Sequence, residues 1–142
     1  MRCQKGGTLV FFGLVLAFVA LALLAVIQIV RYAVAVSDLQ AAADAAAEAA
    51  VSAVDIPTLE ETGEIWFSGS GDVDGLATAY ANTNSVYLAP KGYPITCAVV
   101  EINDADDTVT VACSATVSEL LGRSRTLTRQ ATAKARSLTY GP

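Results

Sequence analysis

The sequence predicts an α+β fold in which a long N-terminal helix, whose first part crosses a membrane, packs on a small antiparallel sheet. Three observations predict this fold. Residues 9–27 form an apolar run without one charged or hydrogen-bonding side chain. An alanine-rich stretch, 39–50, follows with no Gly or Pro in between. In the stretches 95–99, 109–117 and 127–136, the more apolar residues recur at every second position, which is the period of strands with one buried face.

The apolar run Leu9–Ile27 is long enough to cross a bilayer. As a helix its residues span roughly 28 Å, close to the ~30 Å of bilayer hydrocarbon. A helix in a soluble core seldom runs past about 14 residues without a polar face. A cleaved secretory signal is the other alternative, because Ala33-Val34-Ala35 has the small-x-small form of a cleavage site. The run exceeds a usual signal core, and Arg31 and Tyr32 suit an interfacial boundary, so we expect an uncleaved transmembrane helix over 9–30.

The charge distribution predicts the orientation in the membrane. Residues 1–31 carry three basic and no acidic side chains, a net +3, whereas the rest carries six Lys or Arg against fourteen Asp or Glu, a net −8. By the positive-inside rule we expect a single-pass cell-membrane protein with a cytoplasmic N-terminus and an extracytoplasmic C-terminal domain. The acidic balance argues against nucleic acid as a partner. The expected parts are a basic head (1–8), the transmembrane helix (9–30), its extracytoplasmic extension (31–54) and a small α+β ectodomain (55–142).

Residues that carry enzyme or metal chemistry are scarce. The sequence has no His, which excludes Ser-His and Cys-His nucleophile pairs and His-containing metal sites. Its three Cys cannot make a four-cysteine zinc site. The acidic clusters 72–75 and 103–107 each resemble part of a calcium loop, but neither has the Glu and spacing of an EF-hand, so turns or helix caps are the better interpretation. We therefore expect no enzyme, no cofactor, no metal and no small-molecule substrate.

The alanine-rich stretch predicts that the first helix continues to Val54, where Asp55-Ile56-Pro57 ends it. Alanine has the highest helix propensity, and Asp44 and Glu48 share one water-facing stripe at i, i+4. The other faces carry mostly methyl groups. A flat stripe at i, i+3/i+4 spacing lets another helix or a sheet approach closely, and it consists of Leu39, Ala42, Ala43, Ala46, Ala50 and Val54.

A second, shorter helix is expected after an acidic connector, 58–71, in which Ile65-Trp66-Phe67 is more typical of core than of a partner site. Asp72 or Asp74 would cap this helix. Its inward side would carry Leu76, Ala77, Tyr80, Ala81 and Asn84. Residues 85–94 contain two Pro and one Gly, which predicts a loop.

The alternating stretches 95–99 and 109–117 predict a hairpin, with the turn at Asp104-Ala105-Asp106. Folding the chain about Ala105 pairs Val99 with Val111, and a shift by one residue would spoil the apolar face. A third alternating stretch, 127–136, is interpreted as a strand in preference to a helix. Its small alanines would let the sheet sit against the alanine-rich helix.

The same register places Cys97 opposite Cys113 on the apolar face, outside the cytoplasm, where disulfides form. Facing residues have Cα atoms about 4.5 or 5.5 Å apart, and both separations suit a disulfide. The alternative is two buried free thiols that act as small apolar side chains. The sequence therefore predicts a disulfide between Cys97 and Cys113.

The apolar span, Arg31-Tyr32 and the motif LQAAADAAAEAA (39–50) resemble the N-terminal half of TadE/TadG-like proteins, pilin-related components of the tight-adherence (Flp) pilus system. The tail VTVACSATVSELLG (109–122) with LTRQATAKA (127–135) is similar to the closing strands of that family, and Ala79-Tyr80-Ala81 with Asn84 resembles its middle. The resemblance implies a pilin-like fold and, as partners, the membrane, other pilin-like subunits and pilus-assembly or secretion proteins.

The N-terminal head has the general form of a prepilin-type leader, because the basic Lys5 and then Gly6 and Gly7 precede the long apolar helix. Cleavage would follow Gly6 or Gly7. Prepilins of this class usually carry Glu five residues into the mature chain, where this sequence has Phe11 or Phe12. The alternative is a head that only stops the helix and orients it.

Two functions follow as hypotheses. The first is a structural, non-enzymatic, membrane-anchored protein, a minor pilin or assembly component of a Flp-type pilus or related secretion apparatus. The alternative is a single-pass membrane protein whose acidic ectodomain is a binding module without a pilus role.

Overall fold

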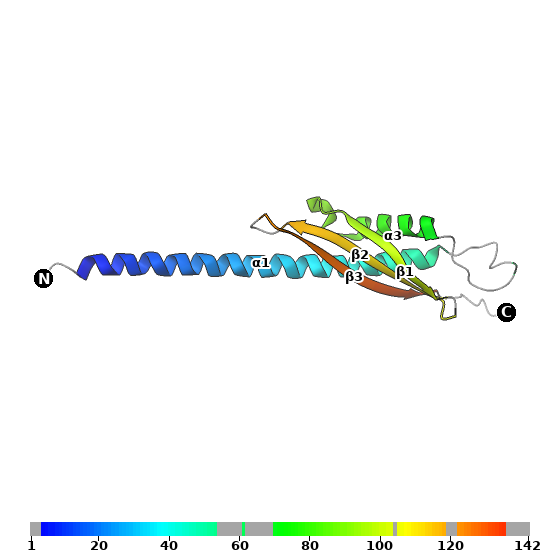
Figure 1. Cartoon of the computed structure of the whole chain (residues 1–142), viewed down its shortest axis with the longest axis horizontal. Coiled ribbons are helices and arrows are strands. Elements are labelled where there is room, and N and C mark those ends of the chain that lie inside the picture. Colours follow the sequence, from blue (N-terminus) through cyan, green and yellow to red (C-terminus); the bar gives the residue numbers. More distant parts are fainter. Residues whose placement is uncertain (1–3, 54–60, 62–69, 104, 119–121, 136–142) are drawn as a thin grey trace. The chain divides into compact units, whose positions relative to one another are not determined.

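The computed structural model describes residues 4–53, 61, 70–103, 105–118 and 122–135. Its elements are α1 (Gln4–Ser52), α3 (Ser70–Asn84), the short 3-10 helix η1 (Ala89–Lys91), β1 (Ile95–Asn103), β2 (Thr108–Ser118) and β3 (Ser124–Lys134). The described strands form one antiparallel sheet in the order β1-β2-β3. The predicted α+β class, a long apolar N-terminal helix with a small antiparallel sheet, is confirmed (Figure 1). The chain divides into two compact units, residues 1–33 and 34–142, which are described separately.

The first unit is the N-terminal part of α1. This helix begins at Gln4, so Gly6 and Gly7 lie within it and do not stop it. Each Gly costs about 1 kcal/mol in a helix relative to Ala, but extending an existing helix adds one hydrogen bond per residue, and the run that follows is long. Among the described residues, α1 is the one helix long and apolar enough to cross a membrane.

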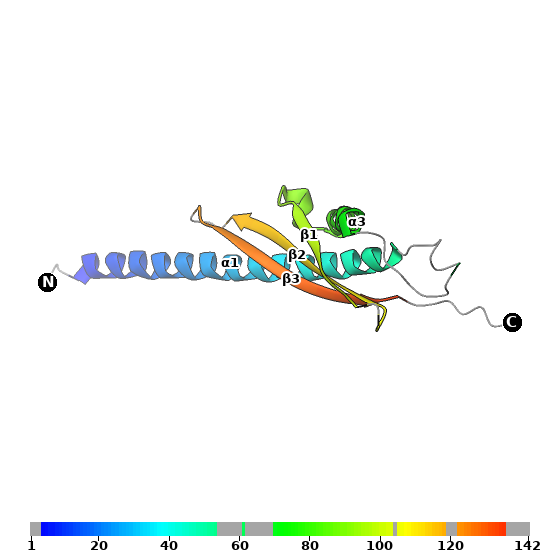
Figure 2. The same cartoon turned by 45° about the vertical axis from the view of Figure 1, so that its right-hand side comes forward.

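The second unit has a core made by the C-terminal part of α1, by α3 and by one face of the sheet. In both views the end of α1 crosses the sheet obliquely, and α3 lies near β1 (Figures 1 and 2). β2 buries every second residue from Val109 to Ala115, as the two-residue period predicts, whereas β1 buries Ile95 and Cys97 and β3 buries only two residues four positions apart. The buried strand residues are Ile95, Cys97, Val109, Val111, Cys113, Ala115, Leu127 and Ala131.

The hairpin has the predicted register over its first half. Cys97 faces Cys113 and Val99 faces Val111, but a bulge after Val99 shifts the pairing, so that Glu101 faces Thr110. The chain therefore does not fold about Ala105 throughout, because the bulged strand has one extra residue. The turn ends at Asp107, whose φ of 55° is left-handed.

The third alternating stretch is a strand, as predicted, although β3 begins three residues before Leu127, at Ser124. It pairs with β2 without interruption, from Thr108 opposite Lys134 to Ser118 opposite Ser124. The predicted end at Arg136 lies outside the described residues.

Two boundaries differ from the predictions. α1 ends at Ser52, whose Oγ donates a hydrogen bond to the carbonyl of Ala49 at 2.6 Å, and Val54 lies outside the described residues. α3 begins at Ser70, before both Asp72 and Asp74, so the prediction that either residue caps it is wrong. Ile65-Trp66-Phe67 also lies outside the described residues.

The buried face of α3 is rotated from the predicted one. Val73, Ala77 and Ala81 are fully buried, whereas Tyr80 is half exposed and Asn84 is exposed. The buried residues recur every four positions, which is a single helical face. Tyr80 lies outside this four-residue spacing.

Candidate functional site

The N-terminal unit carries a continuous exposed apolar surface. Its large apolar side chains are exposed along the run, with fractions of 78% at Leu9, 39% at Val15 and 55% at Val30. Soluble monomers rarely expose apolar patches larger than about 300–600 Å², and larger ones mark membrane or protein contacts. The candidate cleavage residues Gly6 and Gly7 lie in the first turns of the same helix. By length and composition, this helix could cross a membrane.

The predicted packing stripe on α1 is buried. Its described members, Leu39, Ala42, Ala43, Ala46 and Ala50, have no exposed surface. Asp44 and Glu48, by contrast, are exposed, as their spacing predicts. The stripe belongs to the core cluster that it shares with α3 and the sheet. The chain's own domain therefore covers this stripe, and it is not a free surface for another subunit.

The predicted disulfide joins Cys97 and Cys113. Their Cα atoms lie 4.1 Å apart, close to the ~4.5 Å of a facing pair that exchanges no backbone hydrogen bonds. Both cysteines lie on the buried face of the sheet. The bond links the central strand to the strand beside α3, and it excludes the alternative of two free thiols in this state.

α3 closes the outer edge of β1 with side-chain hydrogen bonds. Four helical residues advance about 6.0 Å and two strand residues about 6.8 Å, so polar groups at i, i+4 and i+8 on the helix meet every second strand residue. The amide of Val99 donates to Asp74 Oδ1 at 2.7 Å. Thr78 Oγ1 accepts a bond from the N–H of Cys97 and donates one to its C=O, both at 3.1 Å. Asn82 Oδ1 accepts from the N–H of Ile95 at 3.0 Å, and Asn82 Nδ2 donates to the C=O of Ile95 at 2.6 Å.

A buried carboxylate connects α1 to the loop after α3. Asp38 is only 6% exposed, and it accepts hydrogen bonds from Ser85 Oγ at 2.5 Å and from the amides of Val86 and Leu88, both at 2.9 Å. Burial raises the pKa of Asp38, but the bonds from Ser85 and from the backbone of Leu88, Val86 and Tyr87 outweigh this effect. The pKa of Asp38 therefore lies below its usual value, and the carboxylate holds the loop in its charged form.

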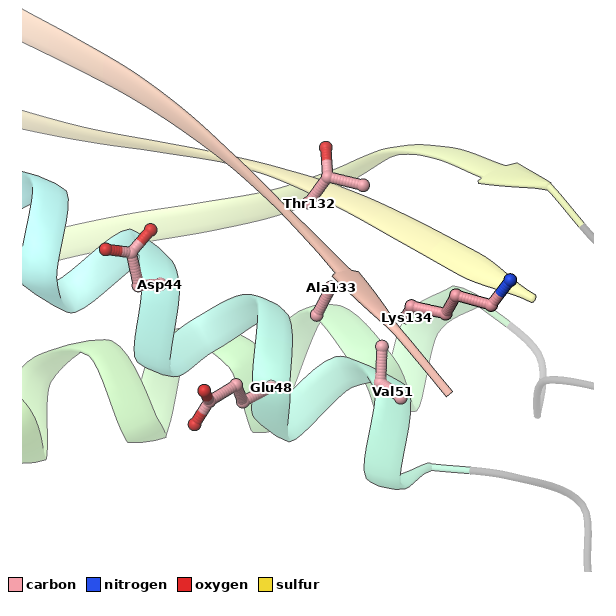
Figure 3. A pocket seen from close by; sticks show the side chains of 6 residues that line it. All are labelled: Asp44, Glu48, Val51, Thr132, Ala133 and Lys134. Carbon is pink, nitrogen blue, oxygen red and sulfur yellow. The ribbon is translucent and has the colours of Figure 1, made fainter. Parts of the chain in front are cut away.

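The far edge of the sheet is open in the described part of the chain, because β3 pairs with β2 alone. Beside this edge lies a groove of about 660 Å³ lined by Asp44, Glu48, Val51, Thr132, Ala133 and Lys134 (Figure 3). Ala133 points toward α1, whereas Thr132 points away from it. The Asp44 carboxylate accepts a hydrogen bond from Gln40 Nε2 at 3.0 Å. The groove thus combines two exposed carboxylates and one exposed lysine with the open edge of β3.

The acidic clusters have structural roles. Asp74 serves the bond to β1 described above. In the β1–β2 turn, Asn103 Nδ2 donates to Asp106 Oδ2 at 2.9 Å, and the amide of Ala105 donates to Asn103 Oδ1 at 3.1 Å. Asp104 lies outside the described residues. Among the residues that are described, no group of three or more His, Cys, Asp or Glu is placed to hold a metal ion.

Sequence reasoning missed the Asp38 contacts and the polar ladder between α3 and β1. The ladder had a usable signal, because Asp74, Thr78 and Asn82 are spaced at i, i+4 and i+8 in a helix followed by a strand. Asp38 gave no such signal, since its partners lie 47 to 50 residues away.

Comparisons with protein-family models, with curated proteins and with solved structures each returned no match.

Proposed function

We propose that this chain is a structural, non-enzymatic, membrane-anchored protein of pilin type, a minor pilin or assembly component of a Flp-type pilus or related secretion apparatus. The observation that carries the proposal is the continuity of α1, from Gln4 to Ser52. One helix supplies both an exposed apolar segment suited to lipid and the alanine-rich side of a folded domain's core. This division of a single helix is what an anchored filament subunit requires.

Two further features support the proposal. The disulfide between Cys97 and Cys113 suits an oxidising compartment, and the basic N-terminus favours a cytoplasmic start, so the domain would lie outside the cytoplasm. The resemblance of 39–50, 109–122 and 127–135 to TadE/TadG-like proteins points to other pilin-like subunits and assembly or secretion proteins as partners.

Topology is tested with reporter fusions after Gly7 and after Pro142. A periplasmic reporter should be active only at the C-terminal site, and mass spectrometry of the membrane-bound chain should find residues 9–30 retained. The N-terminal mass also reports whether cleavage follows Gly6 or Gly7. A soluble product beginning at Val36 would contradict the anchor.

The pilus role is tested by shearing cells and assaying the released filaments for this chain by mass spectrometry, with deletion of the gene as the matched control. We expect either that the filaments contain this chain or that no filaments form without its gene. Normal filaments in the deletion strain, free of this chain in the wild type, would contradict the proposal.

A further inference from the structure

The pairing of the strands identifies the backbone groups that the open edge presents. The N–H and C=O of Cys97 are bonded to Thr78, so Cys97 and Cys113 form a pair without backbone hydrogen bonds between them. In an antiparallel sheet, pairs that exchange backbone hydrogen bonds alternate with pairs that do not. Because the N–H and C=O of Cys113 do not bond to Cys97, they point to the other side, toward Arg129 of β3. The even-numbered residues of β3 therefore turn their backbone groups outward.

Two hydrogen bonds agree with this assignment. The carbonyl of Thr128 lies on the outer side, where it accepts a bond from Arg129 Nη1 at 3.1 Å. The amide of Ala135 donates inward, to the carbonyl of Asp107, at 2.7 Å. The N–H and C=O groups of Gln130, Thr132 and Lys134 then form a row that another strand can pair with.

The side of α1 beside this row is negative. Asp44 and Glu48 are four residues apart and both exposed, and neither pairs with a basic side chain in the described part of the chain. Ala133 and Val51 leave space between the helix and the strand, and the groove volume of about 660 Å³ lies within the ~300–1,000 Å³ typical of binding sites. An extended segment in this groove would meet backbone partners on one side and carboxylates on the other.

We propose that the groove between the open edge of β3 and the acidic side of α1 binds an extended segment of a partner protein as an added strand. Charge complementarity sets its chemistry: every second side chain faces α1, and Lys or Arg there would meet Asp44 and Glu48. The alternate side chains join the outer face of the sheet, where β3 presents exposed threonines at 126, 128 and 132. Such binding does not require the chain to be a filament subunit.

The test uses the full-length chain in a neutral maltoside detergent at 150 mM salt, with fluorescein-labelled eight-residue peptides and fluorescence anisotropy. The probe (Thr-Lys)4 matches the groove. (Thr-Glu)4 reverses the charge, and (Pro-Lys)4 keeps the charge but lacks every second amide donor. We expect (Thr-Lys)4 to bind at least tenfold more tightly than either.

Protein variants locate the binding. Asp44→Asn combined with Glu48→Gln should weaken (Thr-Lys)4 at least tenfold, whereas Glu101→Gln, an exposed carboxylate on β1, should leave it unchanged. Thr132→Pro removes one outward amide from an edge position that tolerates proline, and it should also weaken binding.

Three outcomes would overturn the proposal. Equal binding of (Thr-Lys)4 and (Pro-Lys)4 would mean charge attraction without strand addition, a result that does not depend on the folding of any variant. Equal losses in the groove double variant and in Glu101→Gln would place the peptide elsewhere. The absence of binding by (Thr-Lys)4 at 1 mM would exclude the site, while leaving the membrane-anchor and pilus experiments unaffected.

Discussion

Replacing Thr78 by Val tests whether the polar ladder holds α3 on the edge of β1. Thr and Val have similar helix propensities and similar shapes, so the change removes chiefly one hydroxyl. That hydroxyl makes two hydrogen bonds, to the N–H and the C=O of Cys97, both at 3.1 Å. Cys97 is 4% exposed, so water cannot fully replace the lost partner.

The expected loss follows from these two bonds. Each is worth about 1 kcal/mol net, and groups left unpaired in a buried place cost about 1–3 kcal/mol, so opening of the ladder should become about 2–3 kcal/mol easier. At 1.4 kcal/mol per factor of ten, this speeds exchange of the protected amides about 30- to 150-fold.

The assay is amide hydrogen exchange of the full-length chain in detergent micelles. The informative amides are those of Ile95 and Val99, which bond Asn82 and Asp74 on either side of the substituted residue. Thr83→Val is the matched control, because the Thr83 hydroxyl donates at 2.8 Å to a carbonyl of its own helix and is exposed.

The control should change exchange of these amides less than about threefold, as expected for a surface substitution within about 0.5 kcal/mol. If Ile95 and Val99 exchange equally in Thr78→Val and in the control, the ladder does not hold α3 to the sheet.

Three further predictions concern the core. Because the pKa of Asp38 is lowered in the folded state, the charged carboxylate stabilises the fold fully at pH values well above 3.8, and this stabilisation is lost as the pH falls below 3.8. The guanidinium midpoint of unfolding should therefore be lower at pH 3 than at pH 6, and the difference should be smaller in Asp38→Asn. Replacing both Cys97 and Cys113 by Ala should cost roughly 3 kcal/mol in the free energy of unfolding, given their separation of 16 residues. In the unreduced, denatured chain only the N-terminal cysteine should react with a thiol reagent, and reaction of all three would contradict the bond. Ala43→Leu should cost about 1–3 kcal/mol by overpacking a site with no exposed surface, whereas Glu48→Lys should cost under about 0.5 kcal/mol; equal thermal midpoints would show that α1 is not closely packed there.

The features that the sequence predicted well are periodic ones. An apolar run of nineteen residues and a two-residue alternation each repeat one signal many times, so a single exception does not obscure them. The same alternation aligned the strands, since Cys97 can face Cys113 on the apolar side only in one register. The buried alanines of α1 were predicted in the same way, because they recur at the i, i+3/i+4 spacing of one helical face.

The features that could not be predicted depend on contacts between distant parts of the chain. Asp74 looked like a helix cap because its sequence neighbours suit a helix start, and its role on β1 is visible only once the edge of the sheet is located. Asp38 stands before an alanine-rich stretch, and its partners surround it only after α3 has packed. The bulge after Val99 adds one residue that no alternation marks.

The unequal edges of the sheet have a consequence for how many neighbours it can accept. α3 already occupies hydrogen-bonding groups of Ile95, Cys97 and Val99, so within the described part of the chain β3 offers the longer open edge for an added strand. If two copies pair through their β3 edges, both open edges are used up, so this edge-to-edge pairing ends at a dimer. A polymer of this chain would have to be propagated by another surface, such as the exposed apolar part of α1.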